Sequence, residues 1–457
     1  MIKKQLSFLD DADEARQQLL DSMKEWLSEA RKKHENTEWK GVHDEGTFLT
    51  SWREYYKLTK DQDAYDFFFE RFDACNEWAK HKLKDGYWKK QEVHHGVEHF
   101  IIYLNFLYEL DPNHAGVQRQ LRRAANFIVK GQFFKKPWWD SEKNLFRSLY
   151  LGARRSGSDW LNVVEHLRLI RLGWLGLASG GKSELKDFML RYSKKWATAI
   201  KERENLPLFL IPDGENPDKF QKKFNKKYKK IVGAAPHSAT TRARSEIYIA
   251  NGGPGLFLRL FDVTKDRIYL DAAEKIVTPI LDQIEYPYAF SLAPYCYKLN
   301  ILGRLPDLKQ ICTDIIMKTG LDEMKRAVLN WKPMTIWNKA KYEWLQDTVG
   351  MRKDMVGVEL YDDNGDRIKL LSNLGTLYML YKFTENEQIL SMAYTIADQI
   401  FQLARKWFSD GRSHGCGART TSAYCVGHGR NWGSGYVSCA LRSTLPSDQY
   451  EFFLPVF

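Results

Sequence analysis

The stretch IANGGPGLFL at residues 249–258 is apolar on most sides of a helix, and it is followed by the turn VTKD at 263–266. Beyond the turn, DAAEKIV at 271–277 has apolar residues at helical spacing and keeps one polar face. A helix that is apolar on most sides has to be buried, whereas an amphipathic helix can cover it. This region therefore predicts an inner helix paired with an outer one.

The same pairing recurs along the chain as a weak repeat of helical hairpins. The expected pairs are 45–58 with 62–82, 94–110 with 114–130, 160–178 with 182–202, 242–262 with 266–284, 289–303 with 305–319, and 367–384 with 387–406. The turns inside four of them are short and alike, namely LTKD at 58–61, LDPN at 110–113, VTKD at 263–266 and FTEN at 383–386. Their Thr, Asp and Asn residues are typical N-caps of the second helix.

Two further segments have no partner in this repeat, a helix at about 9–33 and the segment 421–445. Pairing them with each other would close a ring with a seventh, split hairpin. We therefore expect an all-α protein, an (α/α)6 or (α/α)7 toroid of inner and outer helices. A single catalytic domain would span residues 1–457, with little strand.

The composition is that of a globular chain with a basic, aromatic character. The 457 residues include 69 Lys and Arg against 58 Asp and Glu, a net charge of +11, and 15 Trp. This excludes a disordered chain, and no uninterrupted apolar stretch is long enough to span a membrane. The beginning of the chain shows no secretory signal, which leaves a cytoplasmic protein or one whose signal has been removed. Positive charge together with many rings suits an acidic polysaccharide as partner.

The connections between helices are unequal in length. Those inside a pair take a few residues, whereas those between pairs are long: 83–93, 131–159, 203–241, 320–366 and 407–420. Long loops inside a compact domain are usually functional. All of these loops would fall on one face, where the inner helices begin and their N-terminal N–H groups suit anionic ligands. We expect a cleft there.

This helix pattern resembles the α/α-toroid carbohydrate-active enzymes, chiefly the polysaccharide lyases that act on uronic-acid polymers and also certain glycoside hydrolases. The resemblance covers nearly the whole chain as a pattern of helices, and no family-specific motif carries it. It implies a fold and a reaction class, and no functional residue is transferred from it.

Histidine and arginine residues gather at the expected starts of the inner helices. His95 and His99 lie four residues apart on one helix face, a spacing that can hold zinc or a similar divalent metal, although substrate binding and simple packing explain it too. Arg154 and Arg155 can form bidentate pairs with carboxylates, and Trp160 can stack on a sugar ring.

The richest set for proton transfer enters the fourth inner helix. It consists of His237, Arg242, Arg244 and Tyr248, all within a dozen residues. The other candidates on this face are His166 and Tyr295 for proton transfer, and Asn373, His428, Arg430 and Trp432 for substrate binding.

These residue types fit a β-elimination. In the hypothesis, His237 or His166 removes the C5 proton of a uronate, and Tyr248 or Tyr295 protonates the departing O4. Arg242 with Arg155 would neutralise the sugar carboxylate. The reaction needs no cofactor, although a divalent metal at His95 and His99 stays open, and no nucleic-acid motif accompanies the basic charge.

Two alternatives remain at this stage. A glycoside hydrolase needs two carboxyl groups beside the scissile bond, and Asp44, Glu45, Glu98, Asp159 and Glu165 are available on the expected face. A non-catalytic carbohydrate-binding protein would keep the aromatic residues and need no proton donors.

We predict that His237→Ala and Arg242→Ala each lower turnover of a uronic-acid polymer by at least about 10²-fold, because each removes an acid–base or charge-stabilising group. Steady-state rates on purified variants check this. Rates close to those of the unaltered protein would remove both residues from the assignment.

Overall fold

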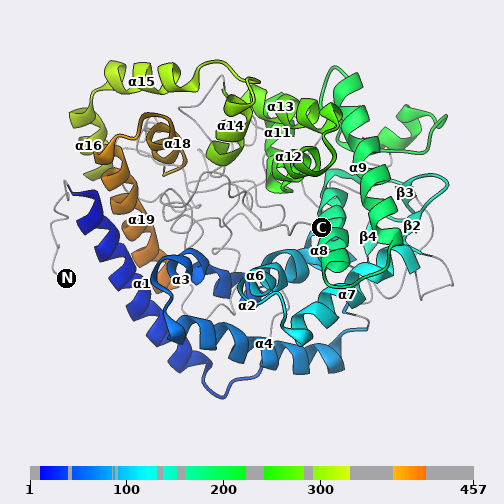
Figure 1. Ribbon diagram of the computed structural model, residues 1–457, viewed down its shortest axis with the longest axis horizontal. Coiled ribbons are helices and arrows are strands. Elements are labelled where there is room, and N and C mark those ends of the chain that lie inside the picture. Colours follow the sequence, from blue (N-terminus) through cyan, green and yellow to red (C-terminus); the bar gives the residue numbers. More distant parts are fainter. Residues whose placement is uncertain are drawn as a thin grey trace.

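The computed structural model describes residues 11–39, 44–84, 86–87, 91–130, 137–151, 160–222, 241–281, 292–329 and 374–407. This part of the chain is mostly helical, which confirms the all-α class (Figure 1). None of its helices is long and apolar enough to cross a lipid bilayer.

The expected helix pairs are present, and several of the first helices are built from short consecutive pieces. The first helices are α2 (Asp44–Leu49) with η1 (Thr50–Trp52) and α3 (Arg53–Thr59), α5 (Val93–Glu98) with η2 (His99–Leu104) and α6 (Asn105–Leu110), η3 (Val164–His166) with α8 (Leu167–Ala178), α11 (Thr241–Ala250) with α12 (Gly253–Thr264), α14 (Leu292–Ile301), and α18 (Leu374–Thr384). The second helices are α4 (Gln62–Lys82), α7 (Ala115–Lys130), α9 (Glu184–Glu202), α13 (Arg267–Leu281), α15 (Leu308–Thr319) and α19 (Glu387–Trp407), and α1 (Ala12–His34) precedes them all.

Three of the short turns share one geometry, which confirms that the units repeat. In each, a Thr hydroxyl donates to the carbonyl four residues earlier, the next residue is left-handed, and the third residue caps the following helix through its side chain. The turns are Thr59–Lys60–Asp61 (φ of Lys60 56°), Thr264–Lys265–Asp266 (φ of Lys265 59°) and Thr384–Glu385–Asn386 (φ of Glu385 54°).

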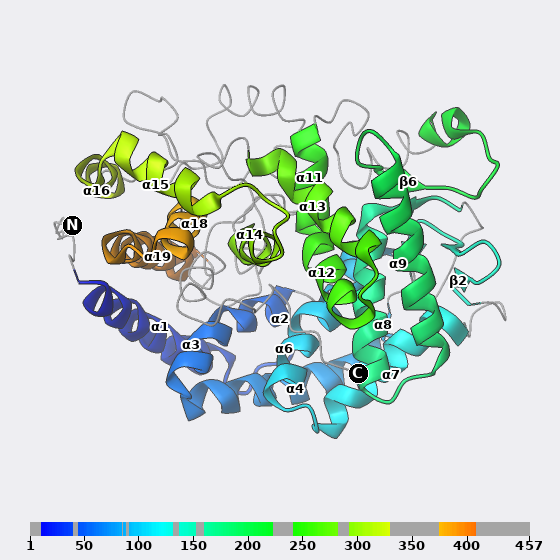
Figure 2. The same ribbon diagram turned by 45° about the horizontal axis from the view of Figure 1, so that its top comes forward.

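Several of the second helices contact one another. Arg31 of α1 pairs with Asp63 and Glu70 of α4, and further contacts join α7 to α9, α9 to α13, and α19 back to α1. The helix α16 (Leu321–Leu329), which follows α15, also contacts α19. In Figure 1 the described helices follow one another around the molecule, and α1 and α19 also lie together in the turned view of Figure 2.

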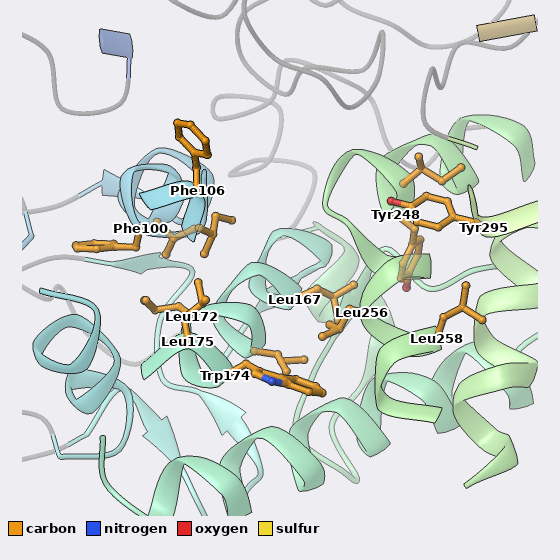
Figure 3. Packing of buried hydrophobic residues seen from close by; sticks show 14 of the residues in the cluster. Phe100, Phe106, Leu167, Leu172, Trp174, Leu175, Tyr248, Leu256, Leu258 and Tyr295 are labelled. Carbon is orange, nitrogen blue, oxygen red and sulfur yellow. The ribbon is translucent and has the colours of Figure 1, made fainter. Parts of the chain in front are cut away.

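The first helices are covered by the second helices and are more completely buried than they are. Every residue of α8 from Leu167 to Gly176 is buried, whereas the amphipathic helix α7 keeps an exposed face. Figure 3 shows apolar side chains of three successive first helices, among them Phe106, Leu172 and Leu256, in one interior region. The apolar first helix and the one-sided second helix predicted from the sequence are therefore both present.

The few strands of the described chain join the long connections to one another. β1 (Gln91–Glu92) pairs with β4 (Tyr150–Leu151), β2 (Trp139–Asp140) with β3 (Leu145–Phe146), and β5 (Asn162–Val163) with β6 (Phe209–Leu210). β1 and β4 belong to successive loops between hairpins, and so do β5 and β6. The described parts of these three connections therefore meet one another through short strand pairs.

Three details differ from the sequence-based expectation. The third first helix does not begin at 160, because residues 162–163 form β5 and pair with β6. The fourth is broken at Gly252, which is left-handed with φ 72°. The connection expected at 320–366 begins with a helix, α16 (Leu321–Leu329), and the closing segment 421–445 lies outside the described residues.

Gly176 marks the closest approach between α7 and α8. A Cβ atom built there would lie 2.0 Å from the Cβ of Ala125. We predict that Gly176→Ala destabilises the fold by about 1–3 kcal/mol, as overpacking does in a tight core. Urea unfolding followed by circular dichroism measures this.

Gly173→Ala in the same helix is the matched control for this prediction. Its Cβ would meet side-chain atoms of Phe188 and Met189 at 3.1 and 3.2 Å, and side chains yield more easily than a packed backbone. Equal losses for both variants would contradict the special role of Gly176.

Candidate functional site

A buried polar network joins three first helices close to the side that carries the long loops. The Nε of Arg168, at the start of α8, donates to Oδ1 of Asn251 at 2.6 Å, and its Nη1 donates to Oε1 of Glu98 at 3.0 Å. Exposed fractions are 1% for Glu98, 6% for Arg168 and 0% for Asn251. The network therefore holds a guanidinium buried among three first helices.

Local backbone irregularities place two members of this network. Glu98 is the last residue of α5, and the π-helix η2 begins directly after it at His99. Asn251 stands between α11 and α12, where the left-handed Gly252 interrupts the helix. π-helical segments inside α-helices are frequent at functional sites, because they re-aim side chains at the cost of regular hydrogen bonding.

The ion pair in this network has a structural consequence. Removing two charged groups from water costs desolvation free energy. Their mutual attraction offsets this cost only when the geometry is good and further hydrogen bonds are made. The hydrogen bond from Arg168 to Asn251 is one of these further bonds, and it fixes the plane of the guanidinium. A fixed guanidinium is well suited to recognising a carboxylate.

A second polar cluster lies where His99, the residue after Glu98, meets α4. The Nε2 of His99 lies 3.7 Å from Sγ of Cys75, and Nη2 of Arg71 lies 3.4 Å from Oε2 of Glu45. Burial raises the pKa of the Cys75 thiol well above its ordinary value, and the charge of Glu45 adds to this. Cys75 is therefore protonated at neutral pH, as expected for a buried core thiol rather than a nucleophile.

Two predicted proton-transfer residues are engaged in anchoring the loops. His166 is fully buried, with Nδ1 3.1 Å from the backbone of Val163 and Nε2 3.3 Å from the carbonyl oxygen of Ser148. The hydroxyl of Tyr248 donates to the carbonyl oxygen of Pro207 at 2.5 Å, and burial raises its pKa well above the ordinary value. These contacts tie both residues to the loop backbone, and their assignment as base and acid stays a prediction.

Tyr295 lies on α14 beside the same region. It is fully buried, and its ring lies 3.1 Å from the place that a Cβ of Gly255 would occupy. Figure 3 shows Tyr248 and Tyr295 close to each other on neighbouring first helices. The absence of a side chain at Gly255 gives the Tyr295 ring its space.

Trp160 and Arg244 are half-buried and held by neighbouring groups. The ring of Trp160 faces Lys143 and Arg147, whose charged groups lie 5.3 and 5.2 Å from its centroid. The Nη1 of Arg244 donates to the carbonyl oxygen of Leu206 at 2.8 Å, and burial lowers the pKa of its guanidinium. Both residues thus bind the loops at the side where the first helices begin.

Several predicted residues fall outside the described part of the chain. These are His237, Arg154, Arg155, Asn373, His428, Arg430 and Trp432, together with the side chains of His95 and Arg242. The metal hypothesis for His95 and His99 depends on one of them. Within the residues that are described, no group of three or more His, Cys, Asp or Glu side chains could hold a metal ion.

Arg168 is the residue that the sequence-based reasoning missed. It stands in LRLIRLGWLGLA, the sequence of α8, where two arginines interrupt an otherwise apolar run. A charge inside a helix that has to be buried needs a partner. That signal was available in the sequence of α8, whereas the partners Asn251 and Glu98 are 83 and 70 residues away.

No protein-family model, no curated protein and no solved structure matches this chain.

The network predicts a measurable coupling between Arg168 and Glu98. We expect Arg168→Met to destabilise the fold by about 3–5 kcal/mol, because it removes the guanidinium that faces a buried carboxylate. In the double variant Arg168→Met with Glu98→Gln the loss should be smaller than the sum of the two single losses by at least about 1 kcal/mol. Urea unfolding of all four proteins completes the cycle, and additive losses would contradict the coupling.

Proposed function

We propose that the chain is an (α/α)6 or (α/α)7 toroid and acts as a polysaccharide lyase on a uronic-acid polymer. The observation that carries this proposal is the buried network in which Arg168 and Glu98, near the starts of two first helices, meet Asn251 at the break between α11 and α12. A lyase needs a fixed positive group for the uronate carboxylate, because neutralising that carboxylate makes the neighbouring C5 proton acidic enough to remove. The net charge of +11 supports an acidic substrate.

In the proposed reaction, a base takes the proton from C5 and the electrons of that bond form the C4–C5 double bond. The C4–O4 bond breaks at the same time, and an acid protonates the departing O4. Arg168 and Asn251 would stabilise the charge that develops on the carboxylate, together with Arg242 and Arg155. With His166 and Tyr248 bonded to the loop backbone, His237 is the proposed base and Tyr295 the proposed acid.

A glycoside hydrolase is the second candidate, and one observation favours it. Glu98 and Glu165 are both buried carboxyl groups, 1% and 2% exposed, and their helices α5 and η3 are in contact. Paired carboxyl groups are what glycoside hydrolysis requires. Glu98 is paired with Arg168, so Glu165 would be the proton donor in this second candidate.

The experiment that separates the two candidates uses polymers of galacturonate, glucuronate and mannuronate as substrates. Ultraviolet absorbance from an unsaturated sugar, formed together with new reducing ends, supports the lyase. Reducing ends without that absorbance support the hydrolase and overturn the elimination.

We predict that Arg168→Lys lowers turnover of the responsive polymer by at least about 10²-fold, because an ammonium cannot reproduce the fork of the guanidinium. Arg53→Lys is the matched control. Arg53 is 7% exposed and pairs with Glu54 and Glu109 near the ends of first helices, where the short turns lie. Turnover of Arg53→Lys should stay within about threefold of the unaltered protein, and equal losses would show that both act through folding alone.

A further inference from the structure

A cleft of about 390 Å³ lies between the second helices α4 and α7, away from the Arg168 network. Its walls come from both helices and its floor from Gly86 and Phe100. The lining residues are Asn76, Ala79, Lys80, Gly86, Phe100, Arg119, Gln120 and Arg123. Its volume is within the range of roughly 300–1,000 Å³ that is usual for small-molecule sites.

The charged side chains that line this cleft, among the described residues, are all positive. Arg119 and Arg123 lie one turn apart on α7, and Lys80 faces them from α4. Lys80 is paired with Glu77 at 2.7 Å, but both side chains are more than half exposed, so this pair contributes little and can yield to a ligand. The cleft therefore favours an anion.

The neutral lining residues suit a polar ring rather than a bare ion. The amide of Gln120 donates to Oδ1 of Asn76 at 2.9 Å, which fixes two side-chain amides at the wall of the cleft. Gly86 is left-handed with φ 86°, and a Cβ there would lie 3.1 Å from the Phe100 ring. Any residue with a side chain at position 86 would therefore have a strained backbone and would also crowd the Phe100 ring.

The place of the cleft connects it to the proposed active site. Phe100 follows His99 in the π-helix η2, and Gly86 belongs to the loop that leads to the first helix carrying Glu98.

We propose that this cleft is an accessory subsite that binds one anionic sugar unit of an acidic polysaccharide. The class of ligand rests on the proposed function, whereas the preference for an anion rests on the cleft alone. The subsite performs no chemistry. It holds the chain of sugars through the guanidinium groups of Arg119 and Arg123 and the amide groups of Asn76 and Gln120.

The test is calorimetric titration of the full chain with tetragalacturonate, with the neutral cellotetraose and with inorganic sulfate. Arg119→Glu with Arg123→Glu should weaken tetragalacturonate binding at least about tenfold, the loss expected for charge-assisted hydrogen bonds. The control is Arg122→Glu with Lys130→Glu, two exposed residues of the same helix outside the cleft, which changes the net charge equally. It should stay within about twofold of the unaltered protein.

The other outcomes of this titration either overturn or support the subsite. An equal loss in both double variants would assign the effect to overall charge and overturn the subsite. Binding of sulfate as tight as that of tetragalacturonate would make the cleft an anion site without sugar recognition, which also overturns it. Loss confined to the cleft variant supports the subsite even if no unsaturated product is formed, so its failure and that of the lyase proposal are separable.

Discussion

The burial of the first helices behind the second ones is the constraint on which the rest of this structure depends. A helix such as α8, buried along most of its length, has no stable place at a surface, so each such helix needs an amphipathic partner on its outer side. The short turns keep the two together, and the repeated Thr hydroxyl bond and left-handed residue end one helix and start the next within three residues. Because these turns are so short, the long connections have to collect at the opposite ends of the helices.

Buried charged side chains are paired in two places along the first helices. Arg53, Glu54 and Glu109 pair near the ends of first helices, where the connections are short, and the positive neighbours of Glu109 keep its pKa low although burial raises it. Arg168 and Glu98 lie near the starts of their first helices and meet Asn251 at the break between α11 and α12. Both networks offset the cost of burying charged groups. Of the two, the network of Arg168 is the one that lies beside loops long enough to shape a binding site.

The sequence-based reasoning succeeded where the signal was local and failed where it depended on contacts across the fold. The hairpins and their turns were predictable, because helical periodicity and N-caps act within a few residues. The strand at Asn162 and Val163 was missed, because its partner lies more than forty residues later at Phe209 and Leu210. The sequence also did not indicate that His166 and Tyr248 lie within hydrogen-bonding distance of the carbonyl oxygens of Ser148 and Pro207.

The sequence by itself determined the helical class and the hairpin repeat, since helical periodicity and short turns are local properties of the chain. Tertiary structure alone decided that Arg168 meets Glu98 and Asn251, residues 70 and 83 positions away, and that Lys80 faces Arg119 across a cleft. The reason is physical. A buried charge has to be satisfied by whichever polar group the packing brings to it, and that packing is set by the volumes of many apolar side chains at once.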